Sequence, residues 1–230
     1  MHWGHQVTKD MIKWEQLPAA LAPDTEYDED GCFSGTAIED KGRHILIYTS
    51  VMKNPDGEGV LQNQSIAVGD RTEYTKIGCN PVVNGDMLPY GLSREDFRDP
   101  KVWHEDGIYY MVARTVDEDK KGQVVLLSSQ DLVNWNFESV LARNDKDYGG
   151  VWECPDFFAI DGHKVLLVSP IENDDKESCQ KVLTTFLVND ILLMTRKVVN
   201  MKKILVRGEG NCDGRGAERE KRETQIHLCI

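Results

Sequence analysis

One repeated motif constrains the fold more than any other feature of this sequence. An aromatic residue is followed by a proline three positions later and by an Asp-Gly pair six positions after that, first in Phe97–Gly107 and again in Trp152–Gly162. Phe33–Gly42 is a looser copy that is one residue shorter. An Asp-Gly pair between apolar runs is the strongest short signal for a β-hairpin. The motif therefore predicts hairpin units that recur along the chain, the alternative being chance similarity among hairpins.

Short apolar runs rich in β-branched and aromatic residues surround these turns, which is typical of strands. They cover residues 44–49, 108–113, 124–127 and 164–169. A second repeat pairs Thr8–Trp14 with Ser129–Trp135. The copies of the first motif start at residues 33, 97 and 152, a spacing that suits four-stranded propeller blades. One such unit cannot bury its faces alone, so the sequence predicts an all-β array closing around an axis. Segments 97–103 and 152–158 are expected to be equivalent inner strands.

The composition changes near residue 172. Residues 1–172 carry a net charge of −14 and 17 of the 18 aromatic residues, whereas residues 173–230 carry +2 and only Phe186. Residues 183–193 fit either a strand or a short helix, and the glycine-rich, charged stretch 208–222 is typical of disorder. We therefore expect a β domain over 1–172 and an atypical, partly disordered tail over 173–230.

Charge and cysteine content exclude several classes of partner and site. The net charge of −12 argues against binding to nucleic acid or to an anionic membrane. The sequence contains no apolar stretch of about 18 residues. Six widely spaced cysteines without a Cys-x-x-Cys pair favour free thiols and a cytoplasmic setting. His2 and His5 lack a nearby third ligand, so no metal site is predicted.

Each full copy of the motif carries an acidic residue between its aromatic residue and its proline, although at neighbouring positions of the repeat. Asp99 and Glu153 lie at the start of the predicted inner strands, from where they could converge on one pocket. Glycosidic cleavage uses such a pair, one carboxyl group to attack or to stabilise positive charge and one to protonate the leaving oxygen. Arg98 beside Asp99 could instead form an ordinary surface ion pair.

Several ordered motifs give this sequence a resemblance to a known family. In chain order they are Trp3-Gly4-His5, the segments 10–14, 17–21 and 23–24, the stretch Asp28–Gly35, Arg98-Asp99-Pro100 and Trp152-Glu153-Cys154-Pro155. Over residues 1–172 the sequence resembles glycoside hydrolase family 32, the β-fructofuranosidases that include invertases and sucrose-6-phosphate hydrolases. The Arg-Asp-Pro and Glu-Cys motifs are the most specific matches.

The resemblance implies a fold, a reaction and roles for four residues. The family is a five-bladed β-propeller, usually followed by a β-sandwich, and hydrolyses terminal β-fructofuranosides with retention. Glu153 would be the general acid/base, and Cys154 would tune its proton affinity. Asp99 would bind sugar hydroxyls and stabilise the transition state, and Arg98 would hold the carboxylates in register.

The resemblance also implies a wall for the fructosyl pocket. Phe33 and Ser34 would line it, and Trp3 would offer an apolar face to the sugar. For these three residues the competing interpretation is ordinary core packing. Trp152 is expected to belong to the core, as are Trp14, Trp103 and Trp135.

Two features depart from the family pattern. The family's nucleophile is an aspartate in an Asn-Asp-Pro-Asn-Gly motif upstream of the Trp-Gly-His strand, and this motif is absent from the sequence. We therefore expect Met1 to be an internal methionine of a longer gene, with Asp24, Asp28 and Asp30 as the only nearby substitutes for the nucleophile. The sequence after Pro170 also does not resemble the family's fourth blade.

Three functions remain open at this point. The first is a β-fructosidase by descent, acting on sucrose or its 6-phosphate without a cofactor. The second is an inactive fragment with residual sugar binding, and the third is an enzyme of a neighbouring family with other pentose substrates, which the Trp-Gly-His and Glu-Cys motifs disfavour. The expected partner is a small sugar. Lys101 and Arg114 are candidates for phosphate recognition by charge alone, and the sequence indicates no oligomeric state.

Overall fold

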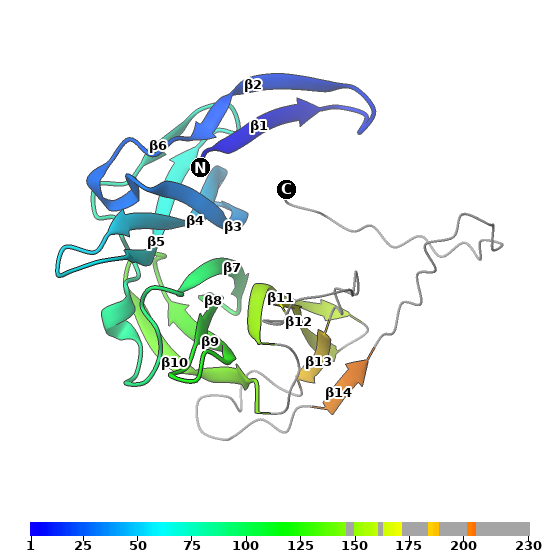
Figure 1. Cartoon of the computed structure of the whole chain (residues 1–230). Coiled ribbons are helices and arrows are strands. Elements are labelled where there is room, and N and C mark those ends of the chain that lie inside the picture. The colour runs from blue at the N-terminus through cyan, green and yellow to red at the C-terminus, as the bar shows by residue number, and fades with distance from the viewer. Residues whose placement is uncertain (146–149, 161–162, 172–183, 189–201, 206–230) are drawn as a thin grey trace, which may run out of the picture.

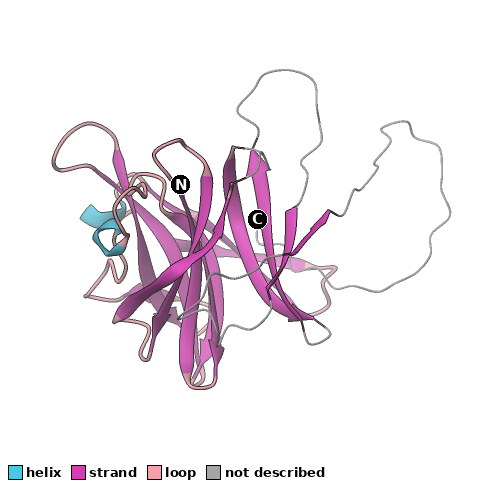
Figure 2. Cartoon of the chain, turned by 90° about the horizontal axis from the view of Figure 1, so that it is seen from below, coloured by secondary structure: helices cyan, strands magenta, loops and turns pink. Residues whose placement is uncertain are grey.

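The structure is a computed structural model that describes residues 1–145, 150–160, 163–171, 184–188 and 202–205. Those residues form strands and two single 3-10 turns, η1 (Glu26–Asp28) and η2 (Gly85–Met87) (Figures 1 and 2). The all-β prediction is therefore confirmed for the described part of the chain.

The strands form one hairpin and three four-stranded antiparallel sheets. The hairpin consists of β1 (Trp3–Thr8) and β2 (Trp14–Leu21). The first sheet consists of β3 (Gly31–Asp40), β4 (Arg43–Lys53), β5 (Val60–Gly69) and β6 (Tyr74–Lys76). The second consists of β7 (Arg98–Glu105), β8 (Ile108–Val116), β9 (Gly122–Ser129) and β10 (Trp135–Arg143). The third consists of β11 (Val151–Ile160), β12 (His163–Ile171), β13 (Thr184–Val188) and β14 (Lys202–Leu205).

Within each sheet the strands follow one another in chain order, so every neighbour is joined by a direct connection. The three sheets lie side by side along an arc (Figure 1). The first strand of each sheet faces its counterpart, because β3 contacts β7 and β7 contacts β11. Segments 97–103 and 152–158 thus occupy equivalent places, as the repeat predicts.

The turns of the repeat have the geometry that their sequence requires. Asp106 and Gly107 both have positive φ, and they join β7 to β8 with a loop of two residues. Lys41 and Gly42 do the same between β3 and β4. Two positive φ values match the right-handed twist of the flanking strands, which explains why glycine ends each pair. The third pair, Asp161 and Gly162, lies outside the described residues.

The second repeat is also a real structural copy. In the β1–β2 turn the Oδ1 atom of Asp10 accepts the N–H groups of Ile12 and Lys13, and in the β9–β10 turn that of Asp131 accepts Val133 and Asn134. These hydrogen bonds lower the pKa of Asp131 to about 2, and the bonds from Asn134 contribute most. The aspartate satisfies backbone donors that the turn leaves without a strand partner, which explains its fixed position in both copies.

The core consists of side chains that fill the spaces between sheets. On β9, Val125 and Leu127 pack toward the first sheet, whereas Val124 and Leu126 pack toward the third. Because successive side chains point to opposite faces, a strand buried on both sides needs an unbroken apolar run. Trp152 is fully buried in the apolar cluster that also contains Val124 and Leu126, as expected.

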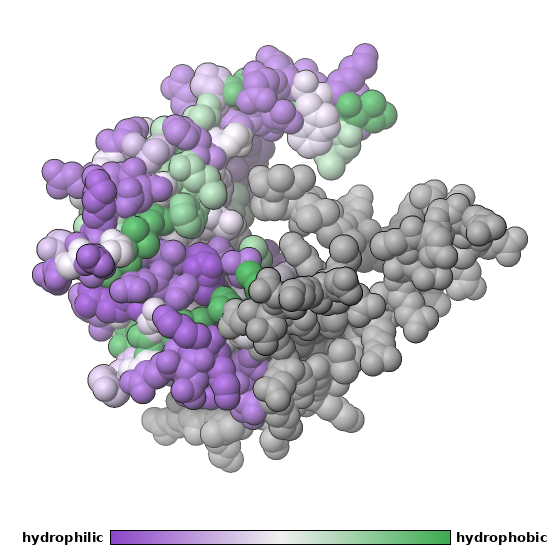
Figure 3. All heavy atoms as spheres, in the orientation of Figure 1, coloured by the Kyte–Doolittle hydropathy of each residue, from purple (hydrophilic) through white to green (hydrophobic). Residues whose placement is uncertain are grey.

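The β1–β2 hairpin differs from the sheets because no third strand pairs with it in the described part of the chain. The far end of the hairpin exposes Met11, Ile12 and Trp14. The rest of the described surface that Figure 3 shows is mostly hydrophilic. The expectation that Trp14 belongs to the core is therefore wrong: the side chain is 53% exposed, whereas its repeat partner Trp135 is buried by a four-stranded sheet.

The third sheet continues beyond residue 172. Strand β13 pairs with β12, and β14 pairs with β13, so the compositional boundary does not coincide with an edge of the sheet. The stretch 208–222, which the sequence predicts to be disordered, lies outside the described residues.

Cys32, Cys79 and Cys154 are free thiols among the described residues. No helix in the described part of the chain is long and apolar enough to span a membrane.

Candidate active site

The structure brings Asp99 and Glu153 together from two different sheets. Arg98 Nη2 donates to Glu153 Oε1 at 2.9 Å, and the backbone N–H of Cys154 donates to Asp99 Oδ2 at 3.0 Å. The two predicted carboxylates are thus linked crosswise, each to the residue beside the other. Asp99 is 8% exposed, and the Glu153 side chain is 34% exposed.

Irregularities of the inner strands place these residues. The pairing register shifts between Phe33 and Gly35 on β3, between Arg98 and Lys101 on β7, and between Glu153 and Asp156 on β11. Asp99 and Cys154 take positive φ values at these points, and a proline follows each. A bulge tolerates proline, which has no N–H for the ladder, and it redirects the neighbouring side chains. The proline of the motif is therefore compatible with the bulge that lies at the candidate site.

Buried polar residues of the first sheet anchor the Asp99 segment. The Asp99 N–H donates to Thr49 Oγ1 at 3.0 Å, and Thr49 in turn donates to Gln64 Oε1 at 3.1 Å. Gln64 Nε2 donates to the Phe97 carbonyl oxygen at 2.9 Å. Both side chains that take part in this network, those of Thr49 and Gln64, are buried, so its bonds fix the Asp99 segment against β4 and β5.

Two charged residues that the motif does not assign belong to the same cluster. Arg114 on β8 is fully buried and contacts Asp96 Oδ1 at 3.5 Å, Asp99 Oδ2 at 4.0 Å and Glu153 Oε1 at 4.0 Å. Asp96 also accepts from Arg98 Nη1 at 3.1 Å. The sequence held one signal for the position of Arg114, because this arginine interrupts the apolar run 108–116. Charged residues are almost never buried without partners, so an arginine there indicates charged neighbours.

Burial and the neighbouring charges shift the titration of the site. Desolvation raises the pKa of Asp99 above its ordinary value, although the Cys154 N–H and Arg98 oppose this effect. Desolvation, Asp99 and Glu153 raise the pKa of the Cys154 thiol to about 11, even though this residue is exposed overall. Cys154 is therefore a neutral thiol near pH 7, which does not suit a nucleophile or metal ligand.

The three residues expected to line the pocket lie on β1 and β3. Trp3 Nε1 donates to the Phe33 carbonyl oxygen at 2.8 Å, and the Trp3 ring meets the Tyr48 ring edge-on. Trp3 and Phe33 are half-buried, and Ser34 is exposed at the bulge of β3 beside β7. Packing accounts for part of the Trp3 surface and leaves part of it accessible.

Two of the three acidic residues considered as substitute nucleophiles, Asp24 and Asp28, are engaged by Lys76, and the third, Asp30, is exposed. Asp28 is fully buried and accepts hydrogen bonds from Lys76, Thr25 and Tyr48. Burial opposes its ionisation, but these bonds outweigh burial and lower the pKa of Asp28. Asp24 forms an ion pair with Lys76, so both carboxylates hold the loop to β6.

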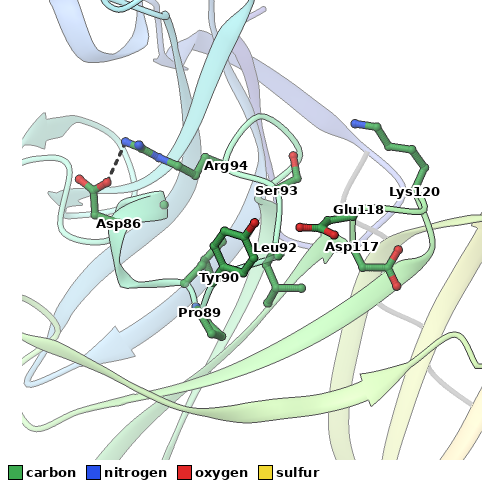
Figure 4. A pocket seen from close by; sticks show the side chains of 12 residues that line it. Asp86, Pro89, Tyr90, Leu92, Ser93, Arg94, Asp117, Glu118 and Lys120 are labelled. Carbon is green, nitrogen blue, oxygen red and sulfur yellow. Dashed lines mark ion pairs between the residues drawn. The ribbon is translucent and has the colours of Figure 1, made fainter.

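A separate cavity of about 470 Å³ lies beside the cluster, between the loop that precedes β7 and the β8–β9 turn (Figure 4). Its lining includes Tyr90 and Arg94 on the loop and Glu118 and Lys120 on the turn, but neither predicted carboxylate. Lys120 Nζ reaches Asp96 Oδ2 at 3.8 Å, so the cavity adjoins the cluster.

Among the residues that the structure covers, no group of three or more His, Cys, Asp or Glu could hold a metal ion.

Lys101, the other candidate for phosphate recognition, pairs with a carboxylate outside the cluster. Lys101 Nζ pairs with Asp156 at 3.0 Å and so connects β7 to β11.

Known proteins match this chain over most of its length. The model of the glycosyl hydrolases family 32 N-terminal domain matches residues 1–201. Raffinose invertase of Escherichia coli is 40% identical over 174 residues, covering 74% of this chain and 35% of that protein. Sucrose-6-phosphate hydrolase of Bacillus subtilis is 38% identical over 172 residues, covering 73% and 35%.

Solved structures agree with these matches. A family 32 β-fructofuranosidase of Bombyx mori superposes with a TM-score of 0.75 at 32% identity, covering 88% of this chain and 43% of that one. Sucrose-6-phosphate hydrolase from Lactobacillus gasseri superposes with a TM-score of 0.70 at 28% identity, covering 84% and 40%. This chain spans about a third of the length of the curated relatives it matches. The family model and these relatives together show that the chain belongs to glycosyl hydrolase family 32.

Proposed function

We propose that this chain carries the acid/base part of a retaining β-fructofuranosidase site, which cleaves terminal β-fructofuranosides. In this proposal the three sheets are blades of a five-bladed propeller, and β3, β7 and β11 face its axis. The observation that carries the proposal is the convergence of Asp99 and Glu153 from β7 and β11. Arg98 donates a hydrogen bond to Glu153, and the Cys154 N–H donates one to Asp99. Paired carboxyl groups in one pocket are the chemistry of glycoside cleavage.

Glu153 is the proposed general acid/base. Both arginine contacts fall on its Oε1 atom, so Oε2 is the oxygen that would carry the proton. In the first step Glu153 gives this proton to the glycosidic oxygen as the bond to the anomeric carbon breaks and a nucleophilic carboxylate supplied by another segment bonds to that carbon. In the second step it takes a proton from the water that releases fructose.

Asp99 is the proposed stabiliser of the transition state. Its Oδ2 atom is held by the Cys154 N–H, and its backbone is held by Thr49. A carboxyl group fixed in this way can accept hydrogen bonds from sugar hydroxyls, and these bonds strengthen as positive charge develops on the ring. Its burial makes the interaction stronger than it would be in water.

The substrate class rests on relatives. Their names include sucrose-6-phosphate hydrolase and raffinose invertase, and a solved structure of the Bombyx mori enzyme contains sucrose. Sucrose and sugars that contain a sucrose unit are therefore the proposed substrates.

A second candidate is a chain that binds sugar without turning it over. Retention requires a nucleophilic carboxylate about 5 Å from the acid. The family's Asn-Asp-Pro-Asn-Gly motif is absent from this sequence, and Asp28 is engaged by Lys76 and Tyr48. We propose that the 230-residue chain does not hydrolyse sucrose until another segment supplies this group.

A chimera tests the role of Glu153 directly. Residues 1–172 replace the matching segment of the Escherichia coli raffinose invertase, which then supplies the upstream and downstream parts. We expect sucrose hydrolysis with β-fructose as the first product, and a loss of about 10²–10⁴-fold in kcat on Glu153→Gln. Glu73→Gln, at an exposed residue directly before β6, is the matched control and should keep full activity. Equal activity of both variants would contradict the proposal.

A further inference from the structure

Arg114 has a position that strand packing does not explain. It lies on β8 directly opposite Arg98 on β7, and its side chain is fully buried. Like charges on directly opposite strand positions destabilise a sheet, and a guanidinium cannot escape this by losing its proton. An apolar residue would fill a strand interior at lower cost.

The surroundings of Arg114 compensate its charge without fully satisfying it. Asp96, Asp99 and Glu153 each place one oxygen within 3.5–4.0 Å of the guanidinium. Nε and Nη2 nevertheless have no hydrogen-bond partner among the described residues, and these are the atoms nearest Asp99 and Glu153. The two donors therefore lie just beyond hydrogen-bond range of the two proposed reacting carboxyl groups.

This geometry separates the roles of the two arginines. Arg98 is part of the family motif and reaches Glu153 Oε1 from the partly exposed side, at 2.9 Å. Arg114 approaches the same oxygen from inside the sheet and also faces Asp99 Oδ2. Hydrogen bonds of catalytic groups are often long without substrate and shorten in the reacting complex. A small movement of either carboxyl group toward Arg114 would form such a bond.

We infer that Arg114 is a positioning residue of the proposed fructosidase site, a permanent buried charge that holds Asp99 and Glu153 in a common orientation. The inference rests on the proposed function for its catalytic meaning. When Glu153 gives up its proton, Arg114 faces the new negative charge on Oε1 at no cost of reorganisation. It also favours the ionised form of Asp99, against the desolvation of that residue.

The first test uses the full chain and needs no turnover. Carboxyl carbon NMR follows the titration of Asp99 in the parent chain, in Arg114→Met and in Arg114→Lys. We expect the Asp99 midpoint to rise by about one pH unit in Arg114→Met and to stay within a few tenths in Arg114→Lys. An unchanged midpoint in a folded Arg114→Met chain would overturn the inference.

Cys154 gives a second readout in the same variants, and it keeps the test valid if carboxyl signals overlap. Its alkylation by iodoacetamide, measured by mass spectrometry across pH, reports the charge of the neighbouring carboxylates. We expect several-fold slower alkylation of Cys154 in Arg114→Met, because less positive charge then offsets Asp99 and Glu153. The exposed Cys79 is the internal control and should react at the same rate in every chain. A change at both cysteines would indicate general unfolding and count against a local role.

Kinetics in the chimera separate this inference from the proposed function. We expect Arg114→Met to lower kcat by about 10²-fold with a KM within a few-fold, and Arg114→Lys to restore most of kcat. An active, Glu153-dependent chimera that is insensitive to Arg114→Met would overturn the role of Arg114 alone. An inactive chimera would count against the proposed function, and the Asp99 titration would still decide on Arg114.

Discussion

At the scale of single residues, Asp99 is a carboxyl group in a buried position. Desolvation raises its pKa above the ordinary value of about 3.9, so the folded chain binds more protons at this residue than the unfolded chain does. Stability that depends on this group is therefore present at low pH and is lost as the pH rises through the folded-state pKa. Burying Asp99 in its ionised form therefore costs stability near neutral pH, and its proposed catalytic role would account for this cost.

We predict that Asp99→Asn makes the chain more stable at pH 7 while removing its proposed catalytic role. The amide oxygen can still accept the Cys154 N–H, and the cost of burying a charge disappears. Urea unfolding should show a higher midpoint for the variant at pH 7 and a smaller difference at about pH 4. A lower midpoint at pH 7 would mean that the contacts of Asp99 with Arg98 and Arg114 outweigh its desolvation.

The sequence was sufficient to predict that Asp99 and Glu153 lie together beside Arg98, because each stands in a motif of specific spacing. Asp96 was not assigned and Arg114 was considered only for phosphate recognition, because their contacts with the carboxylates depend on which strands are neighbours. Arg114 meets Arg98 only through the β7–β8 register, and both meet Glu153 only through the packing of two sheets. Such contacts are not encoded in local spacing.

At the scale of elements, the turns could be predicted but the bulges could not. Asp106-Gly107 specifies its turn by itself, since both residues need positive φ. The bulge at Asp99 depends instead on bonds from other strands, above all from Thr49 on β4. The sequence left strand and helix open for residues 183–193, and pairing with β12 decided it for Thr184–Val188, whereas the other residues of this range lie outside the described part of the chain.

We predict that Thr49→Val loosens the contact between the first and second sheets. The side chains have nearly the same shape, but valine leaves the buried Asp99 N–H and Gln64 Oε1 without their partner. We expect a loss of about 1–3 kcal/mol in the free energy of unfolding, measured with urea. Thr49→Ser keeps the hydroxyl group and is the control. If Thr49→Val and Thr49→Ser unfold at the same midpoint, the hydroxyl bond is not what holds β7.

At the scale of the whole molecule, the chain brings together inner strands of three sheets, and its candidate site lies where two of them meet. The repeat predicted this arrangement because each copy starts a new sheet. Composition did not predict the extent of the third sheet, since β13 and β14 follow the change near residue 172 and still pair with β12. Backbone pairing tolerates such a change in side-chain type.

The central claim is that this chain holds the acid/base part of a family 32 site and lacks its nucleophile. The most direct measurement compares sucrose hydrolysis by the purified 230-residue chain with hydrolysis by the chimera at equal concentration. We predict turnover by the chimera and a rate lower by about 10⁴–10⁶-fold for the chain, as expected when a nucleophile is missing. Comparable turnover by the two proteins would contradict the account and would place a nucleophile within the 230-residue chain.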